Sequence, residues 1–321
     1  MVYLLVYVDD IIITGSSSAL VNDLVLKLDS VFSLKNLGSL NYFLGIEVKH
    51  LADNSLLLTQ SKYIKDLLAK TNMFECNPIN TPMMSSCKLS RQGSDTSHDN
   101  SLYRSLQYAT ITRPEIAYSI NKVCQFMSQP LESHWVAVKR ILRYLKGTLN
   151  YGLKLFPAPI HKPLPLHVFC DADWAADPDD RRSTSGAAIF FGPNLISWWS
   201  RKQPVVARSS TEAEYRSLAQ ATANILWVQT LLQKLTVPFT SPILHTRTKH
   251  MEIDLFFVME KVLAKQLSVV HIPGTDQWAD VLTKPLSTAK FLLMRSKLNV
   301  EENPHWVWGG CIRVSVKIGL V

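Results

Sequence analysis

The segment Leu166-His167-Val168-Phe169-Cys170-Asp171 predicts a buried strand that ends in a carboxylate, because it is mostly apolar until its last residue. The turn residues Gly192-Pro193 lie between two further strand-like runs. The full set of expected elements is strands over 166–171, 185–191, 195–200, 205–208 and 268–271, and helices over 211–235, about 249–264 and from residue 276. Strands followed by helices that alternate with a strand indicate an α/β domain with a mixed sheet.

Upstream of this domain, four prolines between residues 157 and 165 mark a domain boundary. Residues 3–8 and 11–14 are typical of two strands joined by a tight turn, and a hairpin turn is expected at residues 52–54. Residues 76–101 are rich in Ser, Asn, Asp and Pro and indicate a linker. Helices are expected over 103–128, with an interruption at Arg113-Pro114, and over 133–146.

The composition is that of a soluble globular protein large enough for two domains: 321 residues, 47% hydrophobic and 19% charged. A net charge of +8 permits nucleic-acid binding but does not establish it. No segment is typical of a signal peptide or a membrane span. The five cysteines form no CxxC pair, which disfavours a zinc site or a disulfide framework. We therefore expect an intracellular protein, cytoplasmic or nuclear.

Three carboxylates are candidates for metal binding. Asp171 ends a strand, Glu214 lies in the first turn of the long helix, and Asp280 lies in a late helix. Carboxylates from a strand and two helices can converge on a hard cation such as Mg²⁺. Ser209 and Glu212 have the spacing of a capping box, and so do Thr211 and Glu214. We assign Glu212 to helix capping and Glu214 to metal binding.

Asp9 and Asp10 form a second constellation, at the turn between two apolar strands. Adjacent carboxylates at a hairpin tip can bind the divalent cations of a two-metal polymerase. Asp is also an ordinary turn residue, so the pair alone is a weak signal.

The surrounding sequence strengthens that signal. Tyr7-Val8-Asp9-Asp10-Ile11-Ile12-Ile13-Thr14-Gly15 resembles the catalytic hairpin of copia-type LTR-retrotransposon reverse transcriptases. The likeness continues in order to about residue 300, through the stretches 43–47, 60–64, 112–116, 209–215 and 279–286. The chain is therefore identified as resembling the Pol polyprotein of that family, from the end of its reverse transcriptase through its ribonuclease H domain.

This resemblance implies four regions: a partial reverse-transcriptase palm over 1–60, a helical thumb- or connection-like region over 61–156, a ribonuclease H-like domain over 157–300, and a tail with no family counterpart over 301–321. It implies that Asp9 and Asp10 belong to a polymerase site. It also implies that Asp171, Glu214 and Asp280 hold two Mg²⁺ or Mn²⁺ ions that act on the RNA of an RNA–DNA hybrid.

Basic side chains are the candidates for phosphate contacts. They are Lys139, Arg140, Arg143, Lys146, Arg201, Lys202 and Arg208. The first four crowd one side of the helix expected over 133–146. A solvated helix face is the simpler explanation of them, and a phosphate-binding face is the alternative.

Two departures from the family pattern weaken the expected activities. The family's fingers, nucleotide-binding region and first palm aspartate precede the hairpin at which this chain begins, so we expect no polymerase activity unless another chain supplies them. The family's Cys-Asp-Asn strand motif after the long helix is missing, and residues 215–251 contain no Asp or Glu. We therefore expect a mixed sheet with one strand region deleted and an impaired ribonuclease H.

Three readings remain open. The chain could be a metal-dependent ribonuclease H in which Glu252 or Asp254 replaces the missing carboxylate. It could be a non-catalytic remnant that binds an RNA–DNA hybrid or another nucleic acid. It could also be a decayed reading frame whose product does not fold stably. Binding without cleavage separates the second reading from the first, and a non-cooperative melt indicates the third.

Overall fold

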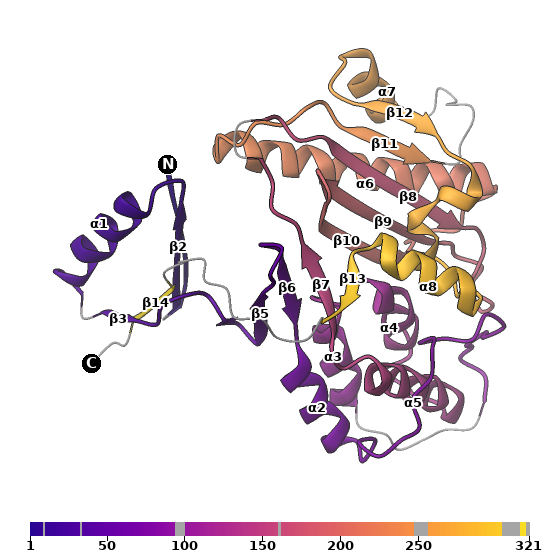
Figure 1. Cartoon of the computed structure of the whole chain (residues 1–321). Coiled ribbons are helices and arrows are strands. Elements are labelled where there is room, and N and C mark those ends of the chain that lie inside the picture. Colours follow the sequence, from indigo (N-terminus) through magenta and orange to yellow (C-terminus); the bar gives the residue numbers. More distant parts are fainter. Residues whose placement is uncertain are drawn as a thin grey trace.

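The computed structural model describes residues 1–8, 10–32, 34–93, 100–159, 162–246, 256–303 and 315–318, with the backbone alone at residues 100, 256 and 315–318. The described residues form an α/β structure in which runs of strands and runs of helices follow one another and the strands make three sheets (Figure 1). The predicted α/β class with a mixed sheet is confirmed.

The N-terminal sheet lies at the left of Figure 1, beside one helix. Its strand order is β1 (Val2–Tyr7), β2 (Asp10–Gly15), β14 (Ser315–Ile318) and β3 (Leu34–Asn36), and α1 (Ser18–Asp29) packs on it. β1 and β2 form the expected antiparallel hairpin. The buried core of this part is small and consists of Ile11, Ile13 and Val21.

The second sheet joins segments that lie far apart in the sequence. Its strands are β13 (Val300–Glu302), β7 (Tyr151–Leu155), β6 (Leu56–Thr59), β5 (Ile46–His50) and β4 (Tyr42–Phe43). The expected hairpin turn is present between β5 and β6, where Asn54 has a φ of 62° and the Asp53 carboxylate accepts the N–H of Ser55. Because β13 pairs with β7, the sheet continues across the boundary predicted near residue 157.

A helical layer packs below this sheet (Figure 1). It consists of α2 (Ser61–Lys70), α3 (Asn100–Ala109), the short helix η1 (Pro114–Ile116), α4 (Ala117–Cys124) and α5 (Glu132–Gly147). The helical segment expected over 103–128 is interrupted at Arg113-Pro114 as predicted.

The interruption is fixed by a buried ion pair. The guanidinium of Arg113 and the carboxylate of Glu115 are both fully buried, and Arg113 Nε donates to Glu115 Oε1 at 2.7 Å. Arg113 also donates to the carbonyl and the hydroxyl of Thr148, at 2.9 and 2.7 Å, and Tyr144 donates to Glu115 at 3.1 Å. Every charge is matched, so the cluster locks η1 against the end of α5.

The third sheet is mixed and lies above the helical layer. Its order is β10 (Asn194–Lys202), β9 (Thr184–Phe191), β8 (Leu166–Asp173), β11 (Ile243–Thr246) and β12 (Ser268–His271). The first three strands are antiparallel and the last three are parallel. The remaining elements are α6 (Ser210–Lys234), α7 (Phe256–Leu263), η2 (Gly274–Asp276), η3 (Trp278–Leu282) and α8 (Thr288–Lys297).

Strand β8 is buried on both faces because its side chains alternate between two cores. Val168 and Cys170 contribute to a core shared with α6. Phe169 contributes to a second core that continues through η3 and α8 into α4 and α5. The mixed sheet and the helical layer therefore share one continuous core, and neither is complete without the other.

Two details of the sequence prediction are wrong. The expected loss of a strand did not occur, because Ile243–Thr246 forms β11 and pairs with both β8 and β12. The short strand expected over 205–208 is irregular backbone, and Val205 and Val206 are exposed. Of the helix expected over about 249–264, α7 is observed, and residues 247–255 lie outside the described residues.

Candidate functional site

The carboxylates of Asp171 and Asp280 come together where η3 packs on the mixed sheet. Asp171 lies near the end of β8, Asp280 lies within η3, and both side chains are fully buried. Gly186 of β9 is the register partner of Asp171, and a Cβ atom there would lie 2.7 Å from Leu282 Cβ and 2.9 Å from its carbonyl oxygen. The glycine therefore permits the close approach that brings η3, and with it Asp280, to the strand end.

A lysine bridges these two carboxylates. Lys284 Nζ lies 3.1 Å from Asp171 Oδ2 and 3.0 Å from Asp280 Oδ1. Lys290 of α8 makes a second ion pair with Asp280, at 2.5 Å, and the Thr283 hydroxyl donates to Asp171. Two ammonium groups thus balance the charge of two buried carboxylates, which is the condition for burying them at low cost.

Glu214 lies at the same end of β8, on helix α6. The helix is tied to the strand by Ser217 Oγ, which donates to the carbonyl of Asp171 at 2.8 Å. Burial raises the pKa of the Cys170 thiol, and the nearby charges of Glu214 and Asp171 raise it further. Glu214 lies three residues before Ser217 on α6, within one helical turn of the contact with Asp171.

Glu212 has the structural role predicted for it. The Ser209 hydroxyl caps α6 by accepting the N–H of Glu212 at 3.1 Å, and the Glu212 carboxylate accepts the N–H of Arg208 at 2.7 Å. Its pKa is lowered, first by hydrogen bonds from Arg216 and then by that backbone bond. Glu212 therefore takes part in the N-terminal cap of α6, as the sequence analysis assigned it.

Asp173 is a further carboxylate near the pair, and the sequence analysis did not single it out. Burial raises its pKa, Lys284 opposes that shift, and the charges of Asp171 and Asp280 add to it. Residues two apart on a strand share a face, so the spacing of Asp171 and Asp173 within β8 was the available signal.

These residues do not fit a two-metal centre as they stand. Within the described ranges, no group of three or more His, Cys, Asp or Glu side chains is arranged to hold a metal ion. Asp171 and Asp280 already have ammonium partners at 3.0–3.1 Å from Lys284. A divalent cation would have to displace that lysine before it could bind between them.

Strand β11 supplies no acidic ligand beside β8. Ile243, Leu244 and His245 pair in parallel register with His167, Val168 and Phe169. All of β11 falls within residues 215–251, which contain no Asp or Glu. The strand that the sequence analysis expected to be missing is therefore present, but it carries no carboxylate.

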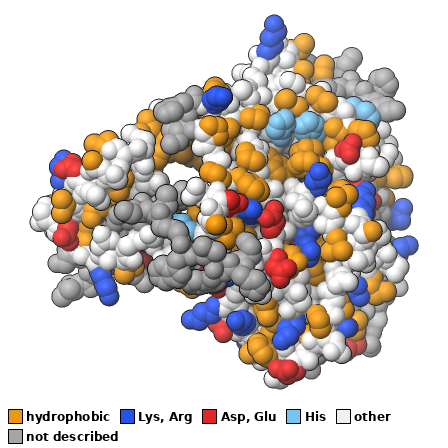
Figure 2. Space-filling model, in the orientation of Figure 1, with side chains coloured by type: hydrophobic (Ala, Val, Ile, Leu, Met, Phe, Trp, Pro, Cys, Tyr) orange, Lys and Arg blue, Asp and Glu red, His pale blue; other side chains and the backbone are white. Residues whose placement is uncertain are grey.

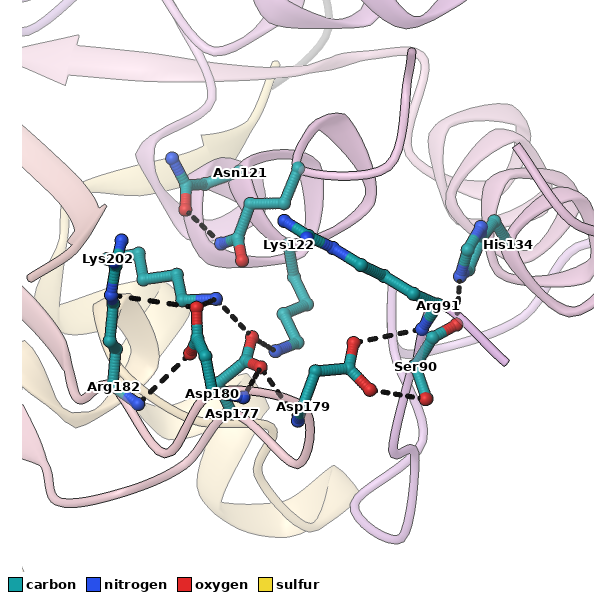
Figure 3. A network of polar contacts seen from close by, with 11 residues as sticks. Ser90, Arg91, Asn121, Lys122, His134, Asp177, Asp179, Asp180, Arg182 and Lys202 are labelled. Carbon is teal, nitrogen blue, oxygen red and sulfur yellow. Dashed lines mark hydrogen bonds and ion pairs between the residues drawn. The ribbon is translucent and has the colours of Figure 1, made fainter. Parts of the chain in front are cut away.

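The remaining acidic residues of the loop after β8 join the two layers of the fold (Figure 3). Asp177 Oδ2 pairs with Lys122 of α4 at 3.0 Å and with Lys202 of β10 at 2.8 Å. Burial opposes ionisation of Asp177, but hydrogen bonds from Lys202 and Lys122 hold its pKa well below the ordinary value. Asp179 accepts the N–H of Arg91, at 2.9 Å, from the linker after α2. We refer to Asp177, Asp179 and their partners as the clamp, because they hold this loop to α4, β10 and the linker.

The four basic residues of α5 largely hold the linker in place. Arg140 donates to the Thr81 hydroxyl at 2.7 Å, and Arg143 donates to the Asn77 carbonyl at 2.8 Å. The other two cations also have neighbours, since Lys146 lies over the Phe74 ring at 4.2 Å and Lys139 lies 3.6 Å from Glu132. On the face shown in Figure 2, Lys and Arg side chains are dispersed among hydrophobic and uncharged ones.

The three other basic candidates differ in exposure. Lys202 is engaged with Asp177 and Asp180, both at 2.8 Å. Arg201 is exposed and lies 6.0 Å from the Trp199 ring centroid, and Arg208 is exposed ahead of α6. Arg201 and Arg208 are therefore the more accessible of the three.

The predicted polymerase hairpin is described only in part. Val8 has a φ of 50°, which is the turn conformation, and Asp10 begins β2 opposite Tyr7. Asp9 lies outside the described residues. The assignment of Asp9 and Asp10 to a polymerase site therefore stays a prediction.

No described helix is long and apolar enough to cross a membrane. Among solved structures, the N-terminal RNase H domain of Rv2228c from Mycobacterium tuberculosis, fused to maltose-binding protein, matches with a TM-score of 0.28 and 12% identity. The match covers 41% of this chain and 97% of that one, and similarity at this level does not establish a fold.

Sequence comparison gives closer relatives. The family model described as reverse transcriptase (RNA-dependent DNA polymerase) matches residues 2–85. The retrovirus-related Pol polyprotein from transposon RE1 of Arabidopsis thaliana is 44% identical, over 95% of this chain and 22% of that protein. The polyprotein from transposon RE2 of the same plant is 41% identical, over 98% of this chain and 23% of that protein. The chain thus spans less than a quarter of the length of these two relatives.

A shorter relative is matched along most of its length. The uncharacterized mitochondrial protein AtMg00810 of Arabidopsis thaliana is 46% identical over 230 residues, which is 70% of this chain and 93% of that protein. With relatives of this identity along nearly its whole length, the chain belongs to the family of copia-type retrotransposon Pol polyproteins.

Proposed function

We propose that this chain is a reverse transcriptase and ribonuclease H fragment that binds RNA–DNA hybrids without cutting them efficiently. In this proposal, residues 157–300 are a ribonuclease H-like domain and residues 61–156 are the connection that supports it. The hybrid is recognised by its backbone shape and 2′-hydroxyl groups rather than by base sequence.

The observation that carries the proposal is the environment of Asp171. Strand β11, beside β8, has no carboxylate to offer, while Lys284 Nζ lies within 3.1 Å of both Asp171 and Asp280. A two-metal hydrolase needs enough negative charge to hold two divalent cations next to the scissile phosphate. Here the buried charges of the pair are already balanced by Lys284 and Lys290.

We propose that Asp171, Glu214 and Asp280 are what remains of a Mg²⁺ or Mn²⁺ site, in which Lys284 and Lys290 now pair with the two aspartates in place of the ions. The chain's own residues hold the carboxylates in place: Ser217 fixes α6 to the backbone of Asp171, and Lys284 holds the two aspartates together. Loss of an outer-shell partner of a metal ligand lowers metal affinity or activity about 10–100-fold. Loss of a ligand itself should lower them at least as much.

Nucleic-acid binding rests on basic side chains along the surface. Arg201, on β10, and Arg208, just before α6, are the exposed candidates. Lys139, Arg140, Arg143 and Lys146 extend the candidate surface along α5, and Lys202 remains a candidate that would have to leave its carboxylate partners. Phosphate contacts of this kind make binding fall steeply with salt.

Polymerase activity is not part of the proposed function of this chain by itself. A two-metal polymerase site needs further metal-binding carboxylates besides the Asp9-Asp10 pair of this hairpin. Incorporation of a labelled nucleotide on a primed RNA template by the purified chain, abolished by Asp10→Asn, would overturn this point.

Binding and cleavage of the same labelled hybrid test the main proposal. We expect fluorescence anisotropy to show salt-dependent binding, unchanged by EDTA, and a gel of the same samples in Mg²⁺ or Mn²⁺ to show intact RNA. Asp171→Asn serves as the control for contaminating nuclease. Cleavage that disappears in Asp171→Asn would show that the site is active, and absence of binding by a cooperatively folded chain would refute hybrid recognition.

A further inference from the structure

A cavity of about 330 Å³ lies between α5 and the linker that follows α2. Its walls include the side chains of Met73, Met83 and Met84 on the linker side and Val136 on the helix side. Pockets that bind small ligands begin at about this size and are mostly apolar with a few polar groups. The cavity lies in the helical layer, and none of its lining residues belongs to the carboxylate pair or its lysine partners.

The polar groups that line this cavity are predominantly cationic. Lys139, Arg140 and Arg143 line it, and none of the residues lining it is Asp or Glu. Arg140 uses one terminal nitrogen on Thr81, and its buried Nε has no hydrogen-bond partner among the described residues. Arg143 uses its Nε on the Asn77 carbonyl. Because the Arg140 Nε is sealed from solvent, the donors that the two guanidinium groups offer to an anion at the cavity are their terminal nitrogens.

The electrostatics of Arg140 agree with this geometry. Burial lowers the pKa of Arg140, and the neighbouring charge of Arg143 lowers it further, with the Cys87 thiol opposing the shift. Two like charges beside an apolar cavity are relieved by a bound anion. The cavity thus favours a ligand with an anionic group at the two arginines and an apolar part beside the methionines.

We propose that this cavity binds one unstacked nucleotide of a single-stranded nucleic acid. The phosphate would lie on Arg140 and Arg143, whose planar forks match its oxygens, and the base would lie against the thioethers of Met83 and Met84, which make favourable contacts with aromatic rings. Single strands are generally held in this way, by cations along the backbone and contacts on the faces of the bases. The proposal rests on the proposed nucleic-acid function and gives it a second contact, away from the carboxylate pair.

Methyl-¹³C methionine NMR tests the proposal with small probes. Adenosine monophosphate is expected to shift the methyl signals of Met83 and Met84 through the ring current of the base. Adenosine is expected to bind at least ~10-fold more weakly, because it lacks the charge-assisted hydrogen bonds, and inorganic phosphate should leave the methyl signals unchanged. Met83→Leu and Met84→Leu assign the signals.

Two variants separate binding from folding. Arg140→Gln should weaken adenosine monophosphate binding ~10-fold or more. Met84→Asp places a carboxylate at a side chain that is 52% exposed, so it should abolish binding without loss of fold. Retained binding in Met84→Asp, absence of methyl shifts with adenosine monophosphate, or equal shifts with octanoate would each overturn the nucleotide assignment.

Hybrid binding measured on the same samples keeps the two proposals distinct. If Met84→Asp still binds the RNA–DNA hybrid but no longer binds adenosine monophosphate, both proposals are supported. If the wild-type chain binds the hybrid but not the nucleotide, the cavity proposal fails alone. If it binds the nucleotide but not the hybrid, the proposed function fails and the cavity site stands.

Discussion

Replacing Asp177 by Asn removes the charge at the centre of the clamp in Figure 3 but retains an oxygen at Oδ1. That oxygen accepts the N–H of Asp179 at 3.0 Å, so the loop can keep its local shape. The lost interactions are the ion pairs with Lys122 and Lys202, whose side chains are 7% and 19% exposed. Removing one partner of a buried pair costs about 3–5 kcal/mol.

A thermal melt by circular dichroism measures this cost. With about 2–4 °C lost per kcal/mol in a unit of this size, we expect Tm to fall by about 6–20 °C. Asp180→Asn is the matched control, because Asp180 also pairs with Lys202 at 2.8 Å but its side chain is 34% exposed, and partly exposed pairs contribute at most about 1 kcal/mol. If both variants melt within about 2 °C of each other, the clamp does not join the two layers as we describe.

Three further changes test other parts of the fold. Arg113→Met should destabilise the chain by about 3–5 kcal/mol in urea unfolding, because it leaves a buried carboxylate unpaired; a loss below about 1 kcal/mol would contradict a buried charge cluster. Gly186→Val should cost about 1–3 kcal/mol by overpacking against η3, and an unchanged melt would show that η3 does not press on β9. Burial lowers the pKa of His134, His167 and His245. The unfolded chain therefore takes up protons first as pH falls below about 6.5, so Tm should drop between about pH 7.5 and 5.5, and a flat profile would refute this linkage.

Much of the fold was predictable because local signals agreed with the tertiary structure. The Gly192-Pro193 turn, the Ser209 cap and the break at Arg113-Pro114 are each set by one or two residues whose conformational preferences are strong. The apolar run from Leu166 to Cys170 predicted a strand that ends at Asp171, and the structure has that strand, extended to Asp173.

The errors arose where tertiary pairing outweighs local pattern. Ile243–Thr246 is too short and too mixed to be read as a strand, but β8 and β12 offer hydrogen bonds on both sides of it. Residues 205–208 have strand-like composition but form no ladder beside the end of β10. The sequence of a short segment does not predict whether a neighbouring strand is available to pair with it.

The candidate site was predictable in its carboxylates but not in their partners. Lys284 lies four residues after Asp280 on the chain, yet only the packing of η3 on Gly186 brings it to Asp171 as well. The clamp around Asp177 joins residues 55 positions apart, and no spacing rule covers such a contact. Asp173 could have been included from its spacing to Asp171 on a strand.

Titration of Mn²⁺ with detection of the free ion by electron paramagnetic resonance tests the central claim most directly. If Lys284 and Lys290 hold the carboxylates in place of metal, the wild-type chain should leave the free Mn²⁺ signal undiminished in the micromolar range, and the double variant Lys284→Gln with Lys290→Gln should bind Mn²⁺ at least ~10-fold more tightly. Micromolar Mn²⁺ binding by the wild-type chain that is lost in Asp171→Asn would contradict the account, because it would show that the carboxylates are available to metal despite their lysine partners.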